Sequence, residues 1–201
     1  SSEVSKPALG VELNGCIGRP RLAFFSPVPP QGSGIAAYSA DLLPALSKFF
    51  DITVVYDSEM SAVGEFMTSV DCISHLHFSG GMFEFIIYQF GNSHYHRYML
   101  PFIEKYPGVI VMHDTYVSGF WGWMETQSGQ EGCYEKNLFY SHPDCSKGGN
   151  GERPMGRALL DSSVGAIVLG EADYNETMAS YKALEPKVEI VSSVCGAPLN
   201  P

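Results

Sequence analysis

A glycine-rich loop follows an apolar segment near the start of the chain. The apolar run at residues 22–26 continues into Pro-Val-Pro-Pro-Gln-Gly-Ser-Gly, and a helix-like pattern begins at Ile35. A loop that opens directly onto a helix brings unpaired backbone N–H groups and the positive helix end to one place, which suits a phosphate. Gly32 and Gly34 carry no Cβ, so a ligand can approach their backbone closely. With Ser33, they are expected to bind an anionic, phosphate-bearing ligand.

This loop does not match the common nucleotide-binding motifs in full. A dinucleotide fingerprint has a third glycine where this chain has Ala37, and its acidic residue, expected about 20 positions later, is at best Asp57. A P-loop would need Lys followed by Ser or Thr, which is not found here. A plain strand-to-helix turn explains the loop equally well, so its function depends on neighbouring loops.

Two further polar segments come directly after strand-like runs. One carries His113 and Asp114, and the other carries Asn92 and Ser93. A histidine in such a place can donate a proton to a hydroxyl or phosphate oxygen. A half-buried histidine bonded to a backbone carbonyl is an equal alternative. Asp114 could cap the following segment or orient the imidazole.

Two His-x-His pairs, His75/His77 and His94/His96, raise the alternative of a zinc or manganese hydrolase. Such a pair on a strand places both rings on one face, which suits a metal ligand set. No Asp or Glu cluster accompanies either pair, and the second pair is expected in a helix, where residues i and i+2 point apart. A weaker zinc candidate combines Cys133, His142 and Cys145 at irregular spacing. We therefore expect no metal.

The elements that must position these loops alternate between strand-like and helix-like patterns. We expect strands at residues 22–26, 51–56, 72–76, 85–90, 109–112, 166–169 and 188–192, and helices at residues 35–49, around 95–103, at 155–162 and at 172–184, with Ser33 as the first N-cap. Residues 1–20 are expected to be a flexible lead-in, and residues 124–153 a polar loop or helical excursion outside the core. This alternation predicts an α/β domain with a doubly wound parallel sheet, a Rossmann-like fold.

The predicted topology brings the polar loops together. In a Rossmann-like sheet the first and fourth strands are neighbours, ligands bind beyond the carboxyl ends of the strands where the order reverses, and the fifth strand lies alongside. The glycine loop follows the first strand, Asn92 and Ser93 follow the fourth, and His113 follows the fifth. The sequence therefore predicts one crevice that all three loops line.

Composition restricts the partners and the location. The 201 residues include 12 Lys and Arg against 22 Asp and Glu, for a net charge of −10. A nucleic-acid partner is not expected, because phosphate neutralisation needs clustered cations. No apolar run reaches the ~20 residues of a membrane span, and no signal peptide is recognisable. The 5 cysteines form no Cys-x-x-Cys pair, which indicates a reducing compartment. We expect a cytoplasmic protein.

Several segments resemble the group 1, family 4 retaining glycosyltransferases. They are Phe25-Ser-Pro-Val-Pro-Pro-Gln-Gly-Ser-Gly-Ile-Ala-Ala-Tyr, Tyr88-Gln-Phe-Gly-Asn-Ser-His-Tyr-His and Val109-Ile-Val-Met-His-Asp. Gly165-Ala-Ile-Val-Leu-Gly, with the later Val188-Glu-Ile-Val, is similar to the end of that family's N-terminal domain. The resemblance covers residues 21–197, and the joint pattern is much more specific than any one loop.

The resemblance implies the N-terminal half of a GT-B fold, in which two Rossmann-like domains flank the active site. The N-terminal domain mainly receives a hydroxyl acceptor, and the C-terminal domain holds most of the nucleotide-diphosphate sugar. The family's glycine loop maps onto Gly32, Ser33 and Gly34, near the donor diphosphate, and its catalytic histidine maps onto His113. Asn92, Ser93 and Asp114 would be second-rank cleft residues. A hexosyl group would be transferred with retention, with no cofactor besides the donor.

One family signature is missing from this chain. The Glu-x7-Glu motif belongs to the C-terminal domain, and no two glutamates here are so spaced. We therefore expect residues 21–201 to be an N-terminal domain whose partner is its own C-terminal domain, and to be inactive alone. The acceptor is expected against the polar stretch after Trp121. The alternative is a non-catalytic nucleotide-binding or interaction module with the same fold.

Overall fold

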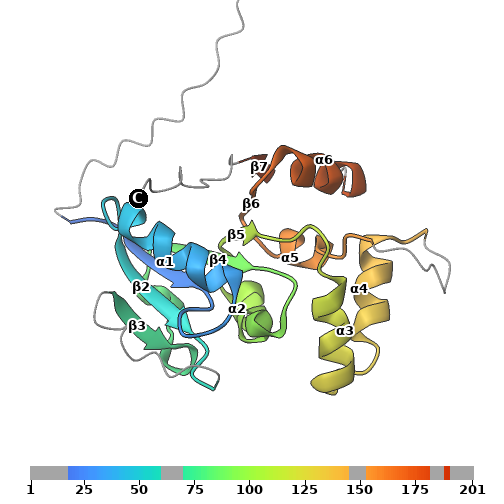
Figure 1. Ribbon diagram of the computed structural model, residues 1–201, viewed down its shortest axis with the longest axis horizontal. Helices are drawn as coiled ribbons and strands as arrows, with labels where there is room; N and C mark the ends of the chain where they lie inside the picture. The colour runs from blue at the N-terminus through green and yellow to red at the C-terminus, as the bar shows by residue number, and fades with distance from the viewer. Residues whose placement is uncertain (1–17, 60–69, 145–152, 182–187, 191–201) are drawn as a thin grey trace, which may run out of the picture.

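A seven-stranded, all-parallel sheet forms the centre of the protein (Figure 1). The computed structural model describes residues 18–59, 70–144, 153–181 and 188–190. The strands are β1 (Arg21–Phe25), β2 (Asp51–Tyr56), β3 (Asp71–Ser74), β4 (Phe85–Phe90), β5 (Val109–Met112), β6 (Gly165–Val168) and β7 (Val188–Ile190). Their order is β3-β2-β1-β4-β5-β6-β7, which confirms the predicted α/β, doubly wound, Rossmann-like fold.

Helices cover both faces of this sheet (Figure 1). The α-helices are α1 (Gly34–Leu46), α2 (Leu100–Lys105), α3 (Ser118–Gln127), α4 (Cys133–Ser141), α5 (Arg157–Asp161) and α6 (Glu171–Ser180). Short 3₁₀ helices are η2 (His75–His77), η3 (Gly80–Met82) and η4 (His94–Met99). In the part of the chain described, no helix is both long enough and apolar enough to cross a membrane.

The central strand β1 is buried on both sides, as its unbroken apolar sequence requires. Leu22 and Phe24 point to one face and pack in a cluster with Leu43 of α1. Phe25 points to the other face, into a larger cluster that includes Ile103 of α2 and residues of α3 and α5. These two clusters fix α1 on one face of the sheet and α2, α3 and α5 on the other.

The strand register places the ends of β1, β4 and β5 at one edge of the sheet. Phe25 at the end of β1 is paired with Tyr88 of β4, and Phe90 at the end of β4 is paired with Met112 at the end of β5. β1 has β2 on one side and β4 on the other, so the strand order reverses between β1 and β4. The predicted neighbourhood of the first, fourth and fifth strands is therefore confirmed.

Some element boundaries differ from the sequence expectation. The third strand ends at Ser74, whose hydroxyl accepts a hydrogen bond from the Leu76 N–H at 3.2 Å and caps η2, so His75 begins a 3₁₀ turn rather than continuing the strand. The helix after β4 begins as the 3₁₀ helix η4 before it becomes α2. Residues 182–184 of the expected helix and 191–192 of the last expected strand lie outside the described residues.

The expectation that residues 124–153 lie outside the core is wrong for their first part. Trp121 and Met124, three positions apart on α3, face the core and are 5% and 3% exposed. Helix α4 packs beside α3, as Figure 1 shows at one end of the molecule. Two polar residues of α4, Asn137 and Ser141, are buried as well. Residues 145–152, and residues 1–17 of the expected lead-in, lie outside the described part.

Candidate functional site

An open pocket of about 580 Å³ lies beyond the carboxyl ends of β1, β4 and β5. Every residue that the sequence analysis selected for the site lines it: Gly32, Ser33, Gly34, Asn92, Ser93, His113 and Asp114. The lining also includes Ile35 and Tyr95, which the sequence analysis did not assign to the site. The three loops therefore meet as the topology predicted.

The amino end of α1 forms one wall of the pocket. Ser33 is its N-cap, with an extended backbone, and its hydroxyl accepts a hydrogen bond from the Ile35 N–H at 3.2 Å. The first helical bond of this turn runs from the Ala37 N–H to the Ser33 carbonyl. Within the described residues, the N–H groups of Gly34 and Ala36 have no hydrogen-bond acceptor. Free N–H groups at a positive helix end are suited to an anion.

The loop before α1 is held by its own hydrogen bonds. The Gln31 side chain accepts from the Val28 N–H at 3.2 Å, and the Gln31 carbonyl accepts from the Ser33 N–H at 2.8 Å. A Cβ built on Gly32 or Gly34 would meet no atom of the described residues within 4 Å. The protein itself therefore does not need glycine at these two positions, and the space in front of them is open to a ligand.

Gly91, directly after β4, lies close both to α1 and to the loop after β5. A Cβ on Gly91 would lie 2.4 Å from the Ile35 Cδ1 of α1 and 2.9 Å from the Asp114 Oδ2 after β5. No side chain fits there without moving one of these groups. From the sequence, Gly91 could be identified only as the residue that ends a strand, because its neighbours in space are distant in the chain.

Asp114 holds the loop after β4, and among the described residues it makes no hydrogen bond to its own segment or to the His113 ring. Its Oδ2 accepts a hydrogen bond from the Asn92 N–H at 2.8 Å. The Asn92 Oδ1 in turn accepts from the Phe120 N–H at 2.7 Å and so caps the first turn of α3. Ser93 faces His96, whose Nδ1 lies 2.9 Å from the Ser93 carbonyl oxygen. Asn92 and Asp114 therefore hold each other and α3 in place beside the pocket, whereas Ser93 contacts His96.

The His113 side chain binds a glutamine rather than a backbone carbonyl. Its Nε2 lies 2.6 Å from the Gln89 Oε1, and its ring packs edge-on against Tyr38, with centroids 4.8 Å apart. Burial lowers the pKa of His113 from 6.5 to about 4, although the Asp114 carboxylate acts in the opposite sense. The imidazole is therefore neutral at pH 7.

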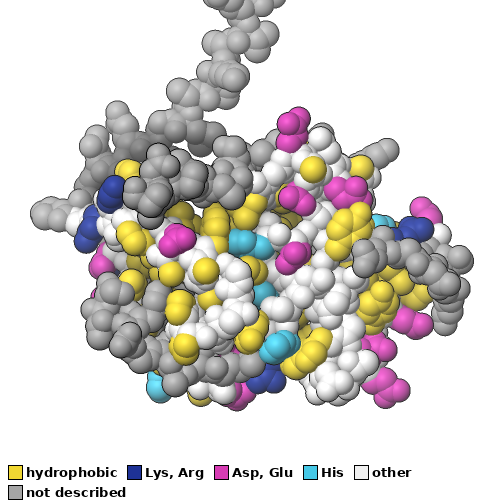
Figure 2. All heavy atoms as spheres, in the orientation of Figure 1, with side chains coloured by type: hydrophobic (Ala, Val, Ile, Leu, Met, Phe, Trp, Pro, Cys, Tyr) yellow, Lys and Arg dark blue, Asp and Glu magenta, His cyan; other side chains and the backbone are white. Residues whose placement is uncertain are grey.

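Among the described residues, the pocket lining contains no Lys or Arg, and Asp114 is its one carboxylate. Figure 2 shows the same distribution on the surface: histidine side chains lie near the middle of this face, and the dark blue Lys and Arg lie toward its edges. Acidic side chains gather over α6. An anion here would meet N–H dipoles and no cation, and a hydroxyl group would meet neutral His113.

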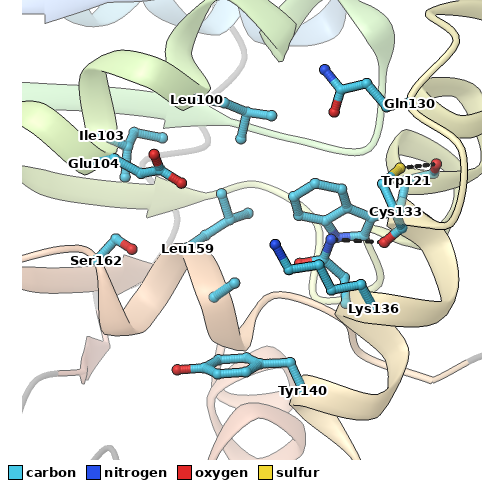
Figure 3. Close-up of a pocket in the computed structure, with 12 residues that line it drawn as sticks. Leu100, Ile103, Glu104, Trp121, Gln130, Cys133, Lys136, Tyr140, Leu159 and Ser162 are labelled. Carbon is cyan, nitrogen blue, oxygen red and sulfur yellow. Dashed lines mark hydrogen bonds between the residues drawn. The ribbon is translucent and has the colours of Figure 1, made fainter.

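A second hollow of about 350 Å³ lies between α2, α4 and α5 (Figure 3). Trp121, Ile103 and Leu159 form its buried apolar wall, and Lys136 and Tyr140 of α4 line it as well. None of the residues that the sequence analysis assigned to the site lines this hollow. The polar stretch after Trp121, where the acceptor is expected, therefore lines a different hollow from the one that contains His113.

The candidate metal ligands that the structure describes do not form a cluster. Among the described residues, no group of three His, Cys, Asp or Glu side chains could hold a metal ion. His75 and His77 lie on η2 rather than on a strand, and the His75 Nδ1 lies 3.7 Å from the Asp57 Oδ1. Asp57 is buried and does not line the pocket of His113. Cys145 lies outside the described residues.

Comparison with known proteins gives no family. A scan against protein-family models finds no match to this chain, and a search of curated proteins finds no relative. A function must therefore be argued from the fold and from the pocket.

Proposed function

We propose that this chain is the acceptor-side, N-terminal domain of a retaining GT-B glycosyltransferase of the family 4 type. The enzyme would move a hexosyl group from a nucleotide-diphosphate sugar to a hydroxyl acceptor. One observation carries this proposal: the glycine loop and the histidine, which the sequence resemblance assigns to donor binding and catalysis, line the same pocket at the point where the strand order reverses. Ligands of Rossmann-like sheets bind at that place.

Each side of the pocket would have its own part in the reaction. The free N–H groups at the start of α1, beside Gly32, Ser33 and Gly34, would stabilise the leaving diphosphate by hydrogen bonds that need no rearrangement. His113, which is neutral and half-buried, would contact the donor sugar. Asn92 and Asp114 would keep the loops in place, since each already holds a neighbouring backbone N–H.

The described part of the pocket lining has no Lys or Arg, which supports a two-domain enzyme. N–H dipoles alone bind a diphosphate weakly in water, so a second domain would supply most of the donor affinity. This chain alone is then expected to transfer no sugar. The full gene product is expected to carry a second Rossmann-like domain with the Glu-x7-Glu signature. If the gene product lacks such a domain, the alternative function, a non-catalytic nucleotide-binding module, is favoured.

A ¹H–¹⁵N NMR titration of the chain tests the site directly. UDP, GDP and their glucose and mannose conjugates should shift the amide signals of Gly32, Ser33 and Gly34 in the millimolar range. Uridine and guanosine, which lack the phosphates, should not. No shift with any nucleotide, or shifts confined to the hollow around Trp121, would contradict the proposal, and sugar transfer by this chain alone would contradict its second part.

Gly34→Ala is the variant that separates binding from folding. A Cβ here meets no described residue within 4 Å, so the free energy of unfolding should stay the same or rise by about 0.5 kcal/mol through the unfolded state. The same Cβ would stand between the backbone and a bound diphosphate, so the nucleotide shifts should weaken at least several-fold. Gly129→Ala is unsuitable as a control because Gly129 has φ 71°, whereas Gly18→Ala, in open space away from the pocket, is suitable.

A further inference from the structure

Gln89 is a buried polar residue that contacts His113 from below the pocket. It is the last but one residue of β4 and is 1% exposed. Its Oε1 lies 2.6 Å from the His113 Nε2, and its own Nε2 is buried without a hydrogen-bond partner among the described residues. An unpaired buried amide nitrogen costs free energy, so the position is not explained by stability alone.

The chemistry of this contact determines where the proton of the ring lies. An amide oxygen can only accept a hydrogen bond, and a neutral imidazole carries one N–H. The Nε2 of His113 must therefore be the donor, and Nδ1 must carry the lone pair. We propose that Gln89 is a positioning residue that holds His113 in the Nε2–H tautomer, so that the pocket-lining ring offers Nδ1 as a hydrogen-bond acceptor.

This tautomer selects what the ring can bind, a consequence that rests on the proposed function. An acceptor nitrogen accepts a hydrogen bond from a hydroxyl group but repels an ionised phosphate oxygen, which has no proton to give. His113 then contacts a sugar hydroxyl, and the diphosphate is left to the N–H groups near Gly34. The Asp114 carboxylate, which also lines the pocket, acts in the same sense. The two walls thus recognise two adjoining parts of a nucleotide-diphosphate sugar, its diphosphate and its sugar.

Glutamine suits this task because it cannot ionise. A carboxylate in its place would favour the imidazolium, in which both ring nitrogens are donors. The other groups around the ring are Asp114 on its own loop, Tyr38 of α1 and His96 of η4. His96 is itself buried and lies against the carbonyl oxygen of Ser93.

Side-chain ¹⁵N NMR of the histidines in the full chain, near neutral pH and without ligand, tests the tautomer. The His113 signals are identified by their loss in His113→Asn. The expected result is a proton on Nε2 that exchanges slowly with water, because it is bonded to a buried amide, and an unprotonated Nδ1. A proton on Nδ1 in the native protein would overturn the inference before any variant is made.

Two substitutions test the role of Gln89. Gln89→Leu should remove the slowly exchanging ring proton, and Gln89→Glu, which keeps the size of the side chain, should protonate both nitrogens near neutral pH. Gln130→Leu is the matched control, because this exposed glutamine lines the other hollow and should change neither signal. An unchanged Nε2 proton in Gln89→Leu would overturn the inference.

A ligand comparison keeps this inference separable from the proposed function. UDP-glucose or GDP-mannose should move the His113 Nδ1 signal more than UDP or GDP, which lack the sugar. If the tautomer is as expected but both kinds of ligand move the signal equally, His113 does not contact a sugar hydroxyl. The positioning role of Gln89 would then still hold. Absence of nucleotide binding together with the expected tautomer would overturn the proposed function alone.

Discussion

His96 and His113 are two buried histidines of the described chain, and their burial is expected to make folding sensitive to pH. Burial lowers the pKa of each from 6.5 to about 4. The His96 Nε2 has no partner among the described residues, so a proton added there would enter an apolar setting against Phe90. Both side chains lie beside the pocket, so the pH dependence of stability arises from groups at the pocket and not from exposed side chains.

The first prediction is that the protein loses stability in mild acid. The unfolded chain binds these two protons more tightly than the folded chain, so the free energy of unfolding should fall as pH drops below about 6.5 and level off below about 4. Each histidine contributes on the order of 3 kcal/mol to the loss. Urea unfolding at a series of pH values measures it.

His113→Asn should make the pH dependence shallower by about half. His77→Gln, a change at an exposed histidine on η2, should leave the slope as it is in the native chain. A slope that is the same in the native chain and in His113→Asn would mean that the His113 proton is not excluded from the folded state.

At the scale of elements, helix α3 depends on a residue from another segment for its cap. Val117 occupies the N-cap position and offers no side-chain acceptor. Asn92, on the loop after β4, supplies the acceptor instead, through its Oδ1 to the Phe120 N–H. Helix α1, in contrast, has its own cap in Ser33. The loop after β4 is thus bound to α3 on one side and to Asp114 on the other.

The second prediction concerns the cap that Asn92 provides for α3. Asn92→Ala should lower the free energy of unfolding by about 1 kcal/mol, because it leaves the Phe120 N–H unpaired. Hydrogen exchange should speed up at Phe120, with little change in α1. Asn92→Asp should restore most of the loss, since a carboxylate accepts the same bond and favours the positive helix end. Equal exchange at Phe120 in Asn92→Ala and the native chain would show that this bond does not cap α3.

At the scale of the whole molecule, the negative net charge works against the binding of an anion in the pocket. The net charge of the chain is −10, and the residues that the structure describes in the pocket lining include no Lys or Arg. A nucleotide therefore approaches against a long-range repulsion and binds through short-range hydrogen bonds. The loop after β5 adds to this field through α6, because Thr115 donates to Asp173 at 2.7 Å and so holds this acidic helix close.

The third prediction concerns the effect of salt on the affinity for a nucleotide. Raising NaCl from about 20 to about 150 mM shortens the Debye length to about 8 Å and screens the repulsion, while the hydrogen bonds are affected little. The affinity for UDP should therefore stay the same or rise. A site built on Lys and Arg would show the reverse. NMR or calorimetric titration at several salt concentrations distinguishes the two, and a several-fold loss of affinity would show that cations outside the described lining hold the phosphates.

Local sequence patterns were sufficient for the fold and for the place of the site. The apolar runs that became β1, β4 and β5 are each continuous and short, and parallel strands with helical crossovers allow few arrangements. The carboxyl ends of these strands must then share one edge of the sheet. The convergence of Ser33, Asn92 and His113 in one pocket follows from this topology.

The contacts inside the pocket depended on tertiary structure alone. Gln89 and His113 are 24 residues apart, and nothing in either local pattern says that their side chains meet. The close approach of Ile35 to Gly91 and the capping of α3 by Asn92 likewise join segments that are distant in the sequence. Backbone periodicity determines which residues reach an edge of a sheet, but side-chain pairing there depends on distances of a few ångströms between separate segments, which only the packed chain fixes.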